Sequence, residues 1–109
     1  MKSLASIGCL FLSISSMAVA DEPIPYDQGN RLLTRYHCQS CHAPYTTLRG
    51  PSLSAIAHKY ASDPTASGEL EANVLNGSSG VWGTESAMPP NTVPAADLHV
   101  LVEWILSFR

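Results

Sequence analysis

The hydrophobic residues of this chain recur mainly at helical spacing. Leu53, Ile56 and Tyr60 fall three and four positions apart, which places them on one face of a helix. A similar apolar stripe leads from Gly29 to Tyr36. We therefore predict one helix in each of these segments.

Two further helices are predicted in the second half of the chain. A short one over residues 68–75 starts with Glu69 and Glu71, and negative charge in a first turn suits the helix dipole. Pro94 is predicted to be the first residue of the last helix, a position that proline favours. The apolar face of that helix consists of Leu98, Leu101, Val102, Trp104, Ile105 and Phe108. Because no segment shows the sustained alternation of a strand, we expect an all-α fold.

Between the last two helices lies a long segment, residues 77–93, that is rich in Gly, Ser and Pro and is predicted as a loop. Loops of this length inside a compact domain tend to be functional. Met88 precedes Pro89 and Pro90, and prolines restrict their own backbone and that of the preceding residue. A thioether on such a stiffened loop suits metal ligation, whereas the ordinary alternative is a methionine that fills a gap in the core.

The first 20 residues have the pattern of an export signal. Lys2 gives a positive start, a mostly apolar or small stretch follows, and Ala18-Val19-Ala20 matches a small-x-small cleavage site. Serines interrupt the apolar stretch, which is shorter than the roughly 20 residues of a membrane span. We expect a signal peptide over residues 1–20, cleaved after Ala20, and export to the periplasm. An uncleaved N-terminal anchor is the alternative.

Removal of this segment leaves one small domain, residues 21–109. Of the 3 cysteines it keeps Cys38 and Cys41, and of the 3 methionines it keeps Met88. The net charge of −3 becomes one unit more negative with the loss of Lys2, which argues against nucleic acid as a partner. A domain of this size has a modest core and often depends on a disulfide, a metal or a cofactor.

Cys38-Gln39-Ser40-Cys41-His42 is the strongest chemical signal in the chain. Cys-x-x-Cys-His is the attachment signature of a c-type haem, in which each thiol can add to a vinyl group and the histidine can bind iron. A disulfide across so short a loop would constrain the unfolded chain little. A thioredoxin-like dithiol needs an α/β pattern, and a zinc site needs a second ligand pair at finger spacing; neither is present. The motif predicts one covalently bound haem c.

Six short motifs follow one another along the chain: Cys38-x-x-Cys41-His42, Gly50-Pro51, Asn76-Gly77-Ser78, Gly80-Val81-Trp82-Gly83, Met88-Pro89-Pro90-Asn91 and Trp104-Ile105-Leu106-Ser107. In that order and at this spacing they resemble the short bacterial class I c-type cytochromes, the periplasmic electron carriers typified in denitrifying bacteria. The resemblance runs from about Gly29 to the C-terminus. It implies a small fold of about four helices wrapped around one covalently bound haem.

Applied to this chain, the resemblance implies that Cys38 and Cys41 hold the haem and that His42 and Met88 are its axial ligands. An imidazole and a thioether favour ferrous iron more than two histidines do, so the potential rises. The expected activity is one-electron transfer between proteins, without enzymatic chemistry on a substrate. The alternatives are a haem c subunit of a larger oxidoreductase complex and a haem enzyme with a labile methionine ligand.

Three further residues receive roles from the same resemblance. The carbonyl of Pro51 accepts a hydrogen bond from the ring of the axial histidine, which fixes the imidazole and tunes the iron. The indole of Trp82 donates to a haem propionate, and Asn91 supports the methionine ligand. The segment from Trp82 to Met88 is one residue longer than the commonest family pattern.

The expected partners are a donor and an acceptor redox protein, which meet the chain through weak, transient contacts near the exposed haem edge. Lys59 is the only lysine left after cleavage, so a ring of lysines around that edge cannot form. We expect a mostly uncharged contact surface, a monomer, and neither nucleic-acid binding nor stable membrane insertion.

Overall fold

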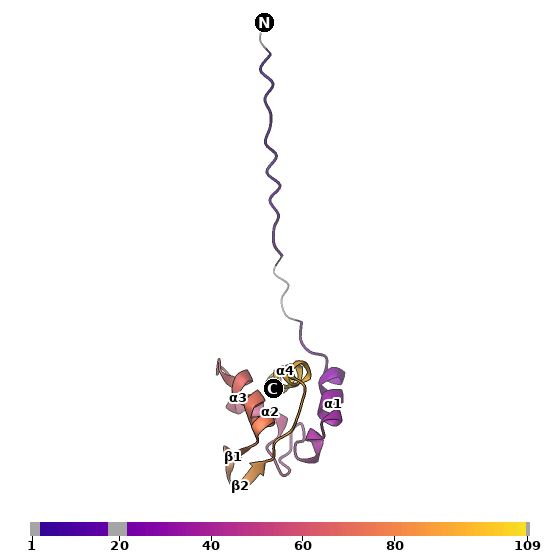
Figure 1. Cartoon of the computed structure of the whole chain (residues 1–109), viewed down its shortest axis with the longest axis vertical. Helices are drawn as coiled ribbons and strands as arrows, with labels where there is room; N and C mark the ends of the chain where they lie inside the picture. Colours follow the sequence, from indigo (N-terminus) through magenta and orange to yellow (C-terminus); the bar gives the residue numbers. More distant parts are fainter. Residues whose placement is uncertain (1–2, 18–21, 109) are drawn as a thin grey trace.

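The computed structural model describes residues 3–17 and 22–108, and of residues 84–86 it describes the backbone alone. The predicted cleavage site after Ala20 lies outside the described residues. Residues 3–17 form no helix or strand and run away from the folded part of the chain (Figure 1). In the described part, no helix is long and apolar enough to cross a membrane.

Residues 22–108 contain four α-helices: α1 (Tyr26–Arg35), α2 (Leu53–Lys59), α3 (Ala66–Asn76) and α4 (Ala95–Leu106). The predicted all-α class is confirmed, and each predicted helix is present. One boundary differs, because Pro94 has an extended backbone (φ −55°, ψ 140°) and caps α4 instead of starting it. Pro25 precedes α1 with nearly the same backbone (φ −58°, ψ 142°). Each proline thus ends the preceding extended segment and lets the helix begin at the next residue.

The segment predicted as a loop contains a small β-hairpin. β1 (Ser78–Gly80) pairs antiparallel with β2 (Gly83–Met88), and Ser78 lies opposite Met88. The sequence pattern missed this hairpin because β1 is a Ser/Gly segment without alternating apolar residues. Its turn depends on Gly80 and Gly83, which both adopt positive φ angles. The hairpin returns the chain so that Met88 lies beside the end of α3.

Helix α4 is the centre of the packing, since it contacts α1, α2 and α3. At its crossing with α1, Gly29 faces Trp104 so closely that a Cβ on Gly29 would lie 2.0 Å from the Trp104 ring. Trp104 is 2% exposed, and its ring meets that of Phe108 edge to face with centroids 4.8 Å apart. Phe108 lies just beyond the end of α4 but is still buried. Gly29 is therefore the small residue that lets the first and last helices approach.

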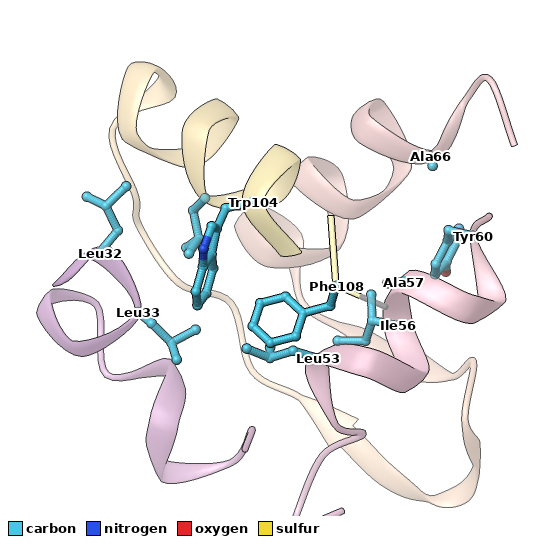
Figure 2. Close-up of a cluster of buried hydrophobic side chains, with 10 residues drawn as sticks. Leu32, Leu33, Leu53, Ile56, Ala57, Tyr60, Ala66, Trp104 and Phe108 are labelled. Atoms are coloured by element: carbon cyan, nitrogen blue, oxygen red, sulfur yellow. The ribbon is translucent and has the colours of Figure 1, made fainter. Parts of the chain in front are cut away.

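The main hydrophobic core surrounds this crossing (Figure 2). Its buried members are Leu32, Leu33, Leu53, Ile56, Ala57, Tyr60, Ala66, Leu101, Trp104 and Phe108. A second cluster of Val93, Leu98 and Val102 joins the start of α4 to the segment before it. Since burying one large aliphatic side chain contributes about 1.5–3 kcal/mol, these contacts are the main force that orients the helices.

A short turn closed by Asp63 precedes α3. The backbone N–H and the hydroxyl of Thr65 both donate to Asp63 Oδ1, at 2.8 and 2.7 Å. These two hydrogen bonds, the one from the hydroxyl first, hold the pKa of Asp63 below its ordinary value of 3.8. Because the pKa of Asp63 is lower in the folded state than in the unfolded chain, these bonds stabilise the fold at pH values above 3.8. Their contribution is lost as the pH falls through the lowered pKa.

We expect Asp63→Asn to remove this pH dependence, because an amide accepts the same bonds without a charge to titrate. The wild-type protein should exceed the variant in thermal stability at about pH 6, and the difference should shrink by about pH 3. Thermal unfolding followed by circular dichroism at both pH values measures it. A difference that stays constant with pH contradicts the expectation.

Candidate functional site

A large cavity opens in the folded part of the chain, and residues from all four α-helices line it. Its empty volume is about 1030 Å³, including space open to solvent. Most lining side chains are apolar; those from the helices include Leu33, Leu53, Ile56, Leu101, Val102 and Ile105. The cavity also brings Cys38, Cys41, His42 and Met88 together. The four residues predicted to hold and ligate a haem thus share one pocket.

The two cysteines and the histidine are carried by one compact turn. Cys38 starts a short 3-10 helix (Cys38–Ser40), and its carbonyl accepts the backbone N–H groups of Cys41 (3.1 Å) and His42 (2.9 Å). His37 precedes this turn with a left-handed backbone (φ 61°). Both cysteines are free thiols, and burial raises the pKa of the Cys38 thiol. The local backbone therefore directs both thiols and the imidazole to the same cavity.

A hydrogen bond at Nδ1 fixes the imidazole of His42. Its Nδ1 lies 2.7 Å from the carbonyl oxygen of Pro51. Because a carbonyl can only accept, Nδ1 carries the proton and Nε2 keeps a lone pair for a metal. Gly50 makes this arrangement possible, since a Cβ there would lie 2.6 Å from Cε1 of the His42 ring.

Met88 ends β2 and is half-buried at the cavity. Gly77, at φ 74°, lies so close that a Cβ would come within 2.6 Å of the Met88 carbonyl oxygen. Three residues further on, the backbone N–H of Asn91 donates to the carbonyl of Val74 at 2.8 Å, and its side-chain Nδ2 donates to the carbonyl of Tyr36 at 2.9 Å. The chain just after Met88 is thus attached to α3 and to the end of α1.

Trp82 lines the same cavity, in the turn of the hairpin, and is 39% exposed. The ammonium of Lys59 lies 5.4 Å from the centre of its ring, a cation–π contact between α2 and the hairpin. Arg49 also lines the cavity. Arg49 and the Trp82 indole therefore line one pocket, and Lys59 lies over that indole. Such an environment favours an anionic group of a ligand.

These observations fit a c-type haem. Free thiols are the groups that form thioether bonds, and an imidazole nitrogen and a thioether sulfur are accepted axial ligands of haem iron. A mostly apolar cavity suits a porphyrin, and a side chain at Gly50 or Gly77 would collide with the His42 ring or with the Met88 carbonyl. The chemistry of the donor set and the shape of the pocket therefore agree.

Neither His58 nor His99 is among the residues that line the cavity; both are exposed, and His99 pairs with Glu71 at 3.1 Å. Sequence reasoning missed the contacts of Tyr36: the apolar spacing places this residue only at the end of a stripe, yet its carbonyl accepts the bond from Asn91 and its hydroxyl donates one to Asp97. No local signal reveals these two contacts, because they join residues 55 and 61 positions apart.

Comparison with known proteins gives relatives along most of the chain, although no protein-family model matches it. The chain is 37% identical over 92 residues to cytochrome c-551 of Stutzerimonas stutzeri, with 84% of this chain and 88% of that protein covered. It is 38% identical over 98 residues to cytochrome c-552 of Hydrogenobacter thermophilus, with 90% and 91% covered.

Solved structures show a similar relationship. Wild-type cytochrome c552 of Nitrosomonas europaea matches with a TM-score of 0.69 and 41% sequence identity, over 73% of this chain and 99% of that chain. The class 1 cytochrome MtoD of Sideroxydans lithotrophicus matches with a TM-score of 0.63 and 27% identity. With such identities over most of both chains, and with the cysteine–histidine turn inside the shared cavity, the chain belongs to the small bacterial class I c-type cytochromes.

Proposed function

We propose that this chain is a monohaem electron carrier whose haem is bound through Cys38 and Cys41 and ligated by His42 and Met88. The observation that carries the proposal is the single cavity lined by all four residues. The hydrogen bond between His42 Nδ1 and the carbonyl of Pro51 supports it, because it holds the imidazole in the tautomer that a metal requires. When bound, the haem supplies one reversible electron; the chain orients it and excludes other ligands.

The proposed role is electron transfer without enzymatic chemistry. Two protein ligands leave no axial position for a substrate. The apolar lining also limits water around the ring, and so acts on the redox potential. A chain of this kind exchanges electrons with a donor and an acceptor protein through small contacts. Monomeric state, export to the periplasm and cleavage after Ala20 belong to the same proposal.

Trp82 and Lys59 are proposed to serve the propionates. An indole N–H can donate to a carboxylate, and the ammonium that lies 5.4 Å from the ring centre adds positive charge at the same place. A charge-assisted contact of this kind is stronger than a neutral one.

The visible spectrum of the protein, made in a host able to attach haem, tests this function. We expect sharp ferrous bands and, in the ferric state, the weak long-wavelength band of methionine-bound haem. The colour should stay with the polypeptide after denaturation, and the paired change Cys38→Ser with Cys41→Ser should abolish that retention. Attached haem without the weak band refutes methionine ligation, and absence of haem refutes the proposal as a whole.

A further inference from the structure

Tyr36 occupies the junction between α1 and the cysteine turn. It is the residue that caps α1, and its backbone N–H still donates to the carbonyl of Leu32. Its own carbonyl accepts the hydrogen bond from Asn91 Nδ2, and its hydroxyl donates to Asp97 in the first turn of α4. One half-buried residue therefore connects α1, α4 and the segment that follows Met88.

The bond to Asn91 bears on Met88 because the chain between them is stiff. Pro89 and Pro90 separate the two residues, and each proline fixes its own φ angle. The backbone N–H of Asn91 is already held by Val74 on α3. With main chain and side chain both attached, Asn91 has little freedom, and the position of Met88 follows from it.

The hydroxyl of Tyr36 in turn keeps the accepting carbonyl in place. Helix ends fray, and a cap residue is ordinarily the first to move. A hydroxyl that donates to a carboxylate makes a charge-assisted bond, which is stronger than a neutral one. The bond also raises the pKa of Tyr36, so the hydroxyl keeps its proton. Arg35 lies 3.8 Å from the same Asp97 oxygen but is 64% exposed, so its contribution is small.

We propose that Tyr36 is a positioning residue for the methionine ligand, which fixes Asn91 through its carbonyl and the end of α1 through its bond to Asp97. The inference rests on the proposed function, because it requires Met88 to be the ligand. In this view Met88 is supported by contacts with α1 and α4 as well as by the residues of its own segment.

Imidazole titration of the ferric holoprotein tests this proposal, since added imidazole competes with Met88 for the iron. A looser methionine segment releases the ligand more often, so imidazole binds more tightly. From the usual strength of single hydrogen bonds, Tyr36→Phe should tighten imidazole binding about threefold and Asn91→Ala about tenfold. Because both changes act on one chain of contacts, the double variant should match Asn91→Ala, not the product of the two effects.

Ser67→Ala is the matched control. Ser67 also donates a hydroxyl hydrogen bond to a carboxylate of α4, that of Glu103, but it lies near the start of α3. It should lower thermal stability without tightening imidazole binding. Asp97→Ala should reproduce the effect of Tyr36→Phe from the α4 side. Asp97→Asn, which keeps an oxygen acceptor but makes only a neutral hydrogen bond, should have a smaller effect than Asp97→Ala.

Two results overturn the inference alone: an imidazole affinity unchanged by Tyr36→Phe, or a double variant whose effect is the product of the single ones. A third result also overturns it, namely a Ser67→Ala variant that binds imidazole as tightly as Tyr36→Phe does. Loss of stability alone would then explain the tighter imidazole binding. Absence of the weak long-wavelength band from the wild-type ferric spectrum is a different failure. It overturns the proposed function, and the inference with it.

Discussion

Met88→Ala should leave the haem attached and yet lower the reduction potential by an amount on the order of 100 mV, within the roughly 0.8 V over which axial ligands set haem potentials. The thioether favours ferrous iron, so its loss favours the ferric state. The variant should also lose the weak long-wavelength band and bind carbon monoxide in the ferrous state, because the axial position that we propose for Met88 would become open. Redox titration followed by absorbance measures the potential, and exposure to carbon monoxide measures the opening.

Met88→Leu serves as the control for this variant, because it fills nearly the same volume without a sulfur. It should share the lowered potential while disturbing the cavity less than alanine does. If both variants keep the wild-type potential, a residue other than Met88 ligates the iron. His58 and His99 are poor candidates, since both are exposed and neither lines the cavity.

Gly29→Ala should destabilise the protein by about 2–3 kcal/mol, although alanine is the better helix former by about 1 kcal/mol. The new Cβ would lie 2.0 to 2.2 Å from three atoms of the Trp104 ring, and Trp104 is 2% exposed. The two helices would have to separate. Chemical denaturation of the holoprotein, followed by tryptophan fluorescence and circular dichroism, gives the free energy of unfolding.

Gly68→Ala is the matched control, since Gly68 lies in α3 and a Cβ there meets nothing within 4 Å. That change should stabilise the protein by about 0.5–1 kcal/mol through helix propensity and a less flexible unfolded chain. If Gly29→Ala is as stable as Gly68→Ala, the α1–α4 crossing is looser than the Gly29–Trp104 contact implies.

The sequence was most informative where a local pattern decides the structure. Apolar spacing predicted α2 and α4, because a helix that packs on one side repeats its buried residues every three or four positions. The cysteine–histidine turn was recognisable because its chemistry needs residues that are adjacent in the chain. Gly29 belonged to a predicted stripe, but its partner Trp104 lies far along the sequence, and no local pattern predicts which side chain a glycine accommodates.

The parts that could not be predicted depend on tertiary contacts. The hairpin has few apolar residues and follows from glycines at positive φ, so it carries no periodicity to detect. Asn91 was expected to support the methionine, but the bond that it makes to Tyr36 depends on where α1 ends. Lys59 is the only lysine that remains after cleavage of the predicted signal peptide. Its contact with the Trp82 ring depends on how α2 and the hairpin pack in the fold, which no local pattern predicts.

The contact between Gly29 and Trp104 also links distant parts of the chain. Its two partners belong to the first and last helices, and the cysteine turn lies between them. The crossing cannot close without α4, so a chain that lacks its last helix leaves the segment between the two partners, with Cys38 and Cys41, open. Trp104, which is 2% exposed, thus joins the two ends of the domain around the cysteine turn.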